Sequence, residues 1–263
     1  MKHHPLIDTH AHLCDPSFTQ DLPQVLDRAR SANITGILIV TEHPSECPLA
    51  IDLCQRFPNH LRCAAGLFPT HLDDASLDAF LALFNDSPSP FAAIGEVGLD
   101  YWKCQEPQDQ ERQRFVFERI VHTAIAHDLP LNVHSRAAGR DTLHLLLDAG
   151  AKRVHMHAFD GKAATAMPGI EAGYYFSIPT SLPRSPQKLK LLKHLPLACL
   201  LLESDSPVLG PVPQERNEPA NLRPLLATVA ELKHTAPEHL AEVITANTRR
   251  LYAPAFNVDP CAL

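Results

Sequence analysis

Short apolar runs alternate with segments of helical character along the whole chain. The runs lie at residues 5–8, 34–41, 61–67, 91–97, 130–134, 153–157, 174–178 and 198–203. Between them the apolar residues follow a helical period, as on one face of 109–127, at Phe117, Ile120, Val121, Ala124 and Ile125. Strands that alternate with helices predict a parallel α/β sheet, which closes naturally into a (β/α)8 TIM barrel. An open doubly wound sheet is the alternative, but no glycine-rich phosphate loop favours it.

The boundaries of the predicted elements fit one domain, residues 1–263. A helix opens near Gly139, where Asp141 is an N-cap or a first-turn acid, and Gly150 ends it. Residues 237–250 form a closing helix, and 251–263 are a short C-terminal tail. The proline-rich segment 204–221 after the last strand is long enough to be functional, although a surface excursion fits it as well.

Composition argues against several classes of protein. A net charge of −7 does not suit a broad basic face that coats nucleic acid. No apolar stretch approaches the roughly 20 residues that span a bilayer, and the N-terminus lacks the apolar core of a signal peptide, so we expect no membrane association. The 7 cysteines are odd in number and include no Cys-x-x-Cys pair. Reduced thiols in the cytoplasm therefore fit better than disulfides or a thiolate zinc site.

Metal-binding side chains recur where the predicted strands end. His10 and His12 follow the first run, and residues two apart on a strand point the same way. The later strand ends carry Glu96 and Asp100, then His134, then His155 and His157, and finally Glu203 and Asp205. In a TIM barrel these ends meet at one mouth. A set of four imidazoles and two carboxylates drawn from these residues suits a pair of divalent zinc, manganese or magnesium ions.

Several motifs occur in a fixed order over about 1–250. They are Asp-Thr-His-Ala-His-Leu (8–13), Gly-Glu-Val-Gly-Leu-Asp (95–100), Asn-Val-His-Ser-Arg (132–136), His-Ala-Phe-Asp-Gly (157–161), Glu-Ser-Asp-Ser-Pro (203–207) and Arg-Asn-Glu-Pro (216–219). Together they resemble the TatD family of metal-dependent deoxyribonucleases, in the subgroup of the third TatD-domain protein of animals. The resemblance implies a (β/α)8 barrel of the metal-dependent hydrolase type.

The resemblance also implies a ligand set for two divalent ions. One ion is expected on His10, His12 and Asp205, the second on His134 and His157, with Glu96 bridging both. A carboxylate has two oxygens and can span ions about 3.5–4 Å apart.

Two residues of this set are expected to be catalytic. Glu96 bridges the ions that activate a water, and Asp205 is expected to accept the proton of that water. The planar fork of Arg136 suits a phosphate oxygen of the substrate, with a surface ion pair as its other interpretation.

Five further residues lie in or near the motifs and outside the proposed ligand set. His155 shares a face with His157, and we expect it in the barrel interior rather than on metal. Glu203 and Asp100 lie beside the site and are candidates to contact the ligands instead of the ions. Phe68 stands where the family commonly has a histidine, and His71 could compensate for it.

The function predicted from these residues is that of a 3′-end-directed deoxyribonuclease. DNA, as a single strand or an end, is the expected substrate, and no protein partner is predicted. The alternative is a metal-dependent carboxylic ester or amide hydrolase, such as a D-aminoacyl-tRNA deacylase, because the same two-metal chemistry supports it. A scaffold on an inactive barrel is a third hypothesis, against which the six convergent ligands argue.

Overall fold

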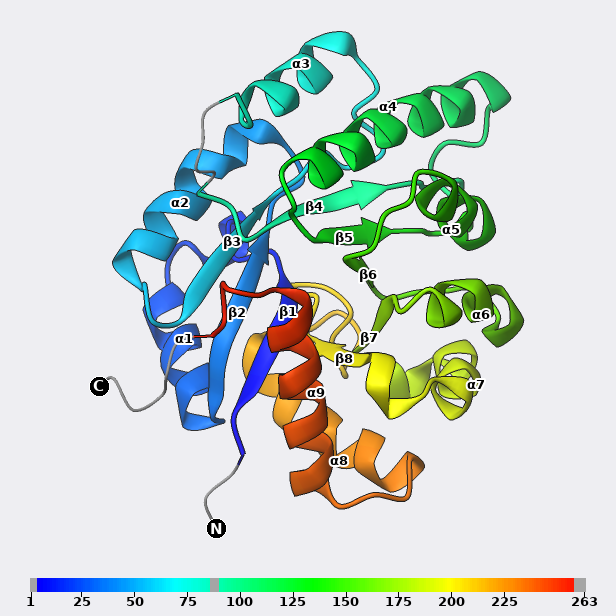
Figure 1. Ribbon diagram of the computed structural model, residues 1–263. Helices are drawn as coiled ribbons and strands as arrows, with labels where there is room; N and C mark the ends of the chain where they lie inside the picture. Colours follow the sequence, from blue (N-terminus) through cyan, green and yellow to red (C-terminus); the bar gives the residue numbers. More distant parts are fainter. Residues whose placement is uncertain (1–3, 86–89, 258–263) are drawn as a thin grey trace.

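The computed structural model describes residues 4–85 and 90–257. Eight parallel strands form one sheet in the order β1 to β8. They are β1 (Leu6–Ala11), β2 (Ile34–Val40), β3 (Leu61–Ala65), β4 (Ala93–Gly98), β5 (Leu131–His134), β6 (Val154–Met156), β7 (Tyr175–Pro179) and β8 (Leu200–Glu203). A parallel bridge between Ala11 and Ser206 joins the first strand to the segment after the last one. The sheet is thus a nearly closed barrel, and the predicted (β/α)8 TIM barrel is confirmed (Figure 1).

Helices lie around the outside of the strands (Figure 1). They are α1 (Leu22–Ser31), α2 (Cys47–Arg56), α3 (Asp74–Ala82), α4 (Pro107–Ala126), α5 (Gly139–Asp148), α6 (Ala163–Glu171), α7 (Pro186–His194), α8 (Leu222–Leu232) and α9 (Pro237–Leu251). Short 3-10 turns occur at η1 (Pro16–Phe18), η2 (Pro44–Glu46), η3 (Leu182–Arg184), η4 (Leu197–Cys199) and η5 (Pro219–Asn221). Among these described helices, none combines the length and the hydropathy needed to cross a bilayer.

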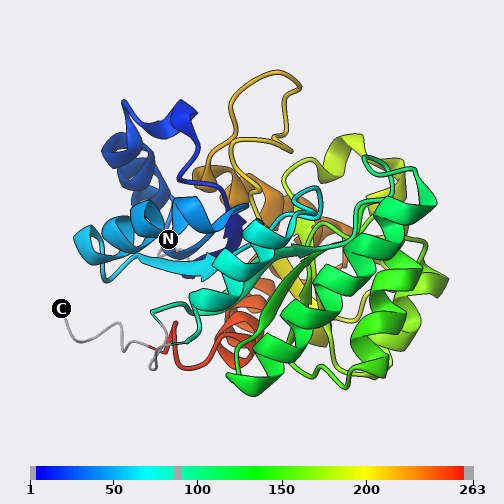
Figure 2. The same cartoon turned by 90° about the horizontal axis from the view of Figure 1, so that it is seen from above.

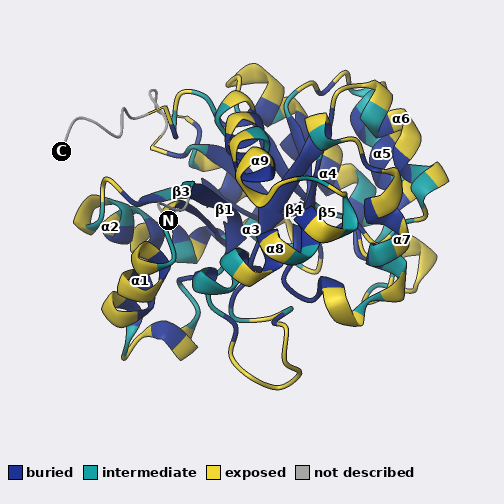
Figure 3. Cartoon of the chain, turned by 90° about the horizontal axis from the view of Figure 1, so that it is seen from below, coloured by how far each residue is buried: buried dark blue, intermediate teal, exposed yellow. Residues whose placement is uncertain are grey.

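The strands are buried on both faces, as the outer layer of helices requires. Every residue of β1 and of β4 is buried, and Figure 3 shows the strands dark and the outer faces of the helices exposed. Helix α4 packs Phe117, Ile120, Val121 and Ala124 inward, as its period predicts. Ile125 is 45% exposed instead, because it lies one position past the edge of that apolar stripe.

The predicted limits of α5 agree with the structure. Asp141 lies in its first turn, and Gly150 follows the C-cap with a φ of +74°. A left-handed residue just past a helix end is the conformation that glycine adopts without strain.

The segment 204–221 projects from the end of the barrel at which the strands finish (Figure 2). Its residues 211–216 are exposed, yet its far end is anchored. The Arg216 guanidinium donates to both carboxylate oxygens of Asp21 at 2.7 and 2.6 Å. The buried Asn217 amide donates to the carbonyls of Ser204 and Val208 at 2.6 and 2.9 Å. The Arg-Asn-Glu-Pro motif therefore fixes this segment beside β8.

The closing helix runs one residue further than predicted, to Leu251. Tyr252, in the predicted tail, is fully buried, and its hydroxyl accepts a hydrogen bond from the Asn132 amide at 3.1 Å. The first part of the predicted tail therefore packs inside the barrel, and its part at 258–263 lies outside the described residues.

Candidate metal centre

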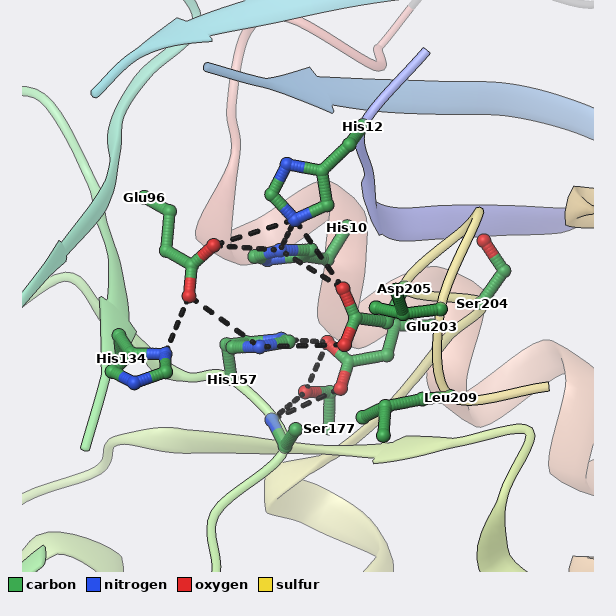
Figure 4. Close-up of polar contacts among 12 residues, drawn as sticks. His10, His12, Glu96, His134, His157, Ser177, Glu203, Ser204, Asp205 and Leu209 are labelled. Atoms are coloured by element: carbon green, nitrogen blue, oxygen red, sulfur yellow. Dashed lines mark hydrogen bonds and ion pairs between the residues drawn. The ribbon is translucent and has the colours of Figure 1, made fainter. Parts of the chain in front are cut away.

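Six predicted ligands converge at the mouth of the barrel (Figure 4). They come from β1 or just after it, from β4, from the end of β5, and from the segments after β6 and β8: His10, His12, Glu96, His134, His157 and Asp205. Three groups in this region could each hold a metal ion: His10, His12 and Glu96; Glu96, His134 and His157; and His10, His157 and Glu203. The first two groups correspond to the two halves of the predicted ligand set.

Glu96 lies between these two halves. Its Oε2 is 3.5 Å from His10 Nε2 and 3.4 Å from His12 Nε2. Its Oε1 is 2.6 Å from His134 Nδ1 and 3.7 Å from His157 Nε2. Each carboxylate oxygen thus faces a different pair of imidazoles, which is the arrangement that a bridging ligand requires.

Asp205 closes the cluster from the segment after β8. Its Oδ1 is 3.6 Å from His10 Nε2 and 3.4 Å from His12 Nε2, and its Oδ2 is 3.8 Å from His157 Nε2. The backbone N–H of Asp205 donates to the His10 carbonyl at 2.9 Å, and the His12 N–H donates to the Ser206 carbonyl at 2.7 Å. The residue has a φ of +57°, so these bonds hold it in a left-handed conformation that aims its carboxylate at the cluster.

Two imidazoles are oriented by partners on their far side. His10 Nδ1 donates to the Asn132 side-chain oxygen at 2.8 Å, which leaves Nε2 facing the cluster. His134 Nε2 donates to Asp100 Oδ2 at 3.0 Å, which leaves Nδ1 facing Glu96. Outer hydrogen bonds of this kind fix the tautomer and the ring plane of metal-binding histidines.

Glu203 gives His157 the same support. Its Oε2 accepts from His157 Nδ1 at 2.9 Å and from the Ser177 hydroxyl at 2.6 Å, and its Oε1 accepts from the Ala158 N–H at 2.9 Å. Glu203 is fully buried and occupied by these donors. Glu203 therefore contacts a ligand, and so does Asp100. The sequence had left open whether these two carboxylates contact the ligands or the ions.

Electrostatics within the cluster favour ionised carboxylates. Burial alone would raise the pKa of Glu96, but the charge of His134 and hydrogen bonds from His10 and His12 hold that pKa well below its usual range. Burial would lower the pKa of His134, yet Glu96 and Asp100 outweigh it and raise the pKa to about 9. Burial and the neighbouring His10 ring, stacked at 3.6 Å, hold the pKa of His157 well below its usual range.

The donor set fits divalent metal ions. The Nε2 atoms of His10 and His12 face each other at 3.1 Å, a contact that a shared cation satisfies better than two protons. Asp205 Oδ1 is buried, and within the described residues it has no hydrogen-bond partner. Imidazole nitrogens and carboxylate oxygens are the ligands that zinc and similar ions prefer.

The structure places the remaining predicted residues around this cluster. Arg136 is exposed at the rim and stacks on Trp102, with 3.7 Å from its guanidinium carbon to the ring centroid. The Phe68 ring lies edge-on to His134 at 4.9 Å between centroids. His71 packs against His43 at 4.8 Å and belongs to none of the ligand groups found among the described residues. His71 therefore does not take the place of the family's usual histidine.

Sequence reasoning missed Asn132, Glu42 and Trp102. Asn132 lies two residues before His134 on β5, so the period of the strand places it on the same face and could have identified it. Glu42 Oε1 is 4.0 Å from His12 Nδ1 and follows β2, at whose end no metal-binding residue was predicted. Trp102 lies two residues after Asp100. It contacts Arg136 because of the geometry of the turn, which the sequence pattern does not predict.

His155 gives a stability prediction. It is fully buried in the barrel interior, as predicted, with Nδ1 accepting from the Tyr252 hydroxyl at 2.8 Å. Burial lowers its pKa to about 3, below the unfolded value near 6.5. Its contribution to stability is thus complete above pH 6.5 and is lost as the pH falls toward 3. We expect the protonation of this histidine on unfolding to lower the free energy of unfolding by about 2 kcal/mol between pH 8 and pH 5.

The measurement is urea unfolding of the metal-free chain and of His155→Gln at both pH values. The variant should lose less stability than the parent chain on acidification. The same substitution at the exposed His122 is the control. Equal pH dependence of the parent and His155→Gln would contradict a neutral, buried imidazole.

Known proteins are similar to this chain in sequence and in fold. The profile of the family described as TatD related DNase matches residues 7–253. The chain belongs to the TatD family. The family predicted from the motifs is therefore confirmed.

Individual TatD relatives match over nearly the whole chain. The human protein named deoxyribonuclease TATDN3 is 41% identical over 258 residues, which cover 94% of each chain. YabD of Bacillus subtilis, described as an uncharacterized metal-dependent hydrolase, is 30% identical over 94% of this chain and 98% of its own. The crystal structure of YjjV, a TatD homolog from Escherichia coli, superposes with a TM-score of 0.87 at 27% identity, covering 97% of this chain and 98% of YjjV.

Proposed function

We propose that this chain is a metal-dependent deoxyribonuclease that hydrolyses phosphodiester bonds in DNA. The observation that carries the proposal is Glu96, whose two oxygens face four imidazoles and which lies with Asp205 in one buried cluster. Membership of the TatD family supports the hydrolase chemistry, and the name of the human relative supports DNA as substrate.

The ligand set is proposed to hold two divalent ions, of zinc, manganese or magnesium. His10, His12 and Asp205 would hold one, His134 and His157 the other, and Glu96 both. Bound ions of this kind lower the pKa of a water and neutralise charge on a phosphate. Asp205 would accept the proton of the attacking water, since its Oδ1 lacks a hydrogen-bond partner in the described part of the chain. Arg136 would bind a phosphate oxygen at the rim.

We further propose an exonuclease that acts from the 3′ end of a single strand. The ligands lie where the strands end, which is the end of the barrel from which segment 204–221 projects (Figure 2). A strand end should reach ligands at the end of a barrel more easily than a rigid duplex does. The cytoplasm is the proposed compartment, because the six described cysteines are free thiols.

The test is cleavage of 3′-labelled and 5′-labelled single strands in the presence of each metal. The expected result is release of the 3′ label in the first cleavage, while the 5′-labelled strand shortens in steps. An aminoacyl-tRNA serves as the competing substrate. Hydrolysis of that ester without any cleavage of DNA would contradict the proposed nuclease.

Salt dependence of binding provides a further prediction. With a net charge of −7, the protein should contact few phosphates, through the metal centre and Arg136. Each phosphate of a single strand contributes about −0.7 to the slope of log affinity against log salt, so we expect a slope equivalent to about two or three phosphates. Fluorescence anisotropy of a labelled strand across a salt series measures it. A slope equivalent to about six or more phosphates would reveal a basic groove instead.

A further inference from the structure

The turn after β4 exposes an aromatic ring beside the metal centre. Trp102 is the sole tryptophan of the chain, and 55% of its surface is exposed. Its backbone N–H donates to Asp100 Oδ1 at 3.0 Å, and Asp100 Oδ2 accepts from His134 Nε2 at 3.0 Å. One carboxylate therefore joins this turn to a proposed metal ligand.

Arg136 lies over one face of the exposed ring. Its guanidinium carbon is 3.7 Å from the ring centroid, well within stacking contact. The turn is fixed against the segment after β5, because the Tyr101 N–H donates to the Arg136 carbonyl at 3.0 Å and the Leu99 N–H to the His134 carbonyl at 3.1 Å. In the described part of the chain no hydrogen bond or ion pair occupies the guanidinium, so its N–H groups remain available to a ligand.

Another exposed arginine–aromatic pair provides a contrast. Phe115 on α4 is 45% exposed, with the guanidinium carbon of Arg112 at 5.1 Å from the ring centroid. That guanidinium is already engaged, since it donates to the Leu72 carbonyl at 2.8 Å and to Asp74 at 2.5 Å. The pair at Trp102 differs because, among the described residues, its guanidinium makes no hydrogen bond or ion pair, and because it adjoins the metal centre.

We propose that Trp102 and Arg136 form a stacking subsite for one unpaired nucleobase of the substrate. The inference rests on the proposed function, since it names how a nucleotide is held while its phosphate lies at the metal centre. Every base has a π-face that can stack on an aromatic ring or a guanidinium plane, so the subsite tolerates all four bases. In a duplex these faces are covered by neighbouring pairs. The subsite therefore selects single strands and frayed ends.

The experiment compares two substrates that differ only in their bases. One is oligothymidylate, and the other is an abasic oligomer with the same phosphates. Trp102→Ala is expected to raise KM for oligothymidylate about 10-fold or more, as loss of one base stack does, and to leave the abasic oligomer unchanged. Trp102→Phe keeps a ring face and should retain most of the affinity. Phe115→Ala is the matched control and should change neither substrate.

A second readout uses the sole tryptophan directly. Oligothymidylate should quench the fluorescence of the wild-type protein on binding, whereas the abasic oligomer should not. An equal increase in KM of Trp102→Ala for both substrates, or equal quenching by both, would overturn the subsite and leave the nuclease proposal intact. Quenching by oligothymidylate without any cleavage of it would overturn the proposed function and leave the subsite standing.

Discussion

Glu96→Gln is expected to lower kcat on DNA by at least about 10³-fold, which corresponds to about 4 kcal/mol of transition-state stabilisation. The amide keeps the size of the side chain but removes the charge that lies between two pairs of imidazoles, at 2.6 to 3.7 Å from their nitrogens. A neutral amide cannot bridge two divalent ions as a carboxylate does. The measurement is steady-state turnover at saturating metal, with circular dichroism to follow the fold.

The matched control is the same substitution on an exposed helix. Glu118 on α4 has a side chain that is 59% exposed, and Glu118→Gln should leave turnover unchanged. Asp100→Asn tests an outer partner, because it weakens the support of His134 without removing a proposed ligand. Outer partners typically contribute about 10- to 100-fold to activity. The loss of kcat in Asp100→Asn should therefore be smaller than in Glu96→Gln and larger than in Glu118→Gln. Activity of Glu96→Gln within a few-fold of the parent would exclude the bridging role.

The sequence predicted the parts of the site that depend on strand geometry. His10, Glu96 and His134 follow from apolar runs whose carboxyl ends must meet in a barrel. Their convergence needs no knowledge of side-chain packing, because the strand order of a (β/α)8 barrel alone places these ends together.

Other parts depend on contacts that no periodicity encodes. Glu42 faces His12 from the segment after β2, and Trp102 reaches Arg136 through a turn that Asp100 holds by accepting two backbone hydrogen bonds. The positive φ of Asp205 also follows from long-range bonds, to His10 and through Ser206. Such details are set by segments distant in sequence, so they become visible only once the chain is folded.

Removal of metal is the second change with a large expected effect. Exhaustive chelation should abolish turnover and lower the Tm by about 10 °C, because an ion present at 1,000-fold its Kd adds about 4 kcal/mol of stability to the folded state. Physically, chelation leaves two buried carboxylates and four imidazoles without a shared cation, including an Asp205 Oδ1 that has no hydrogen-bond partner among the described residues. Calorimetry and turnover before and after restoring zinc, manganese or magnesium measure both effects.

Two variants separate this stabilisation from a general effect of chelation. His155→Gln alters a buried interior histidine that belongs to none of the ligand groups among the described residues, so it should keep the full metal-dependent shift in Tm. Asp205→Asn removes a charge that faces His10 and His12, so it should lose most of that shift. A Tm that is the same with and without metal in the parent chain would mean that the cluster holds no ion in the folded protein. Protons on the imidazoles would then have to balance the negative charges of Glu96 and Asp205. The structural basis for a metal-dependent hydrolase would be lost.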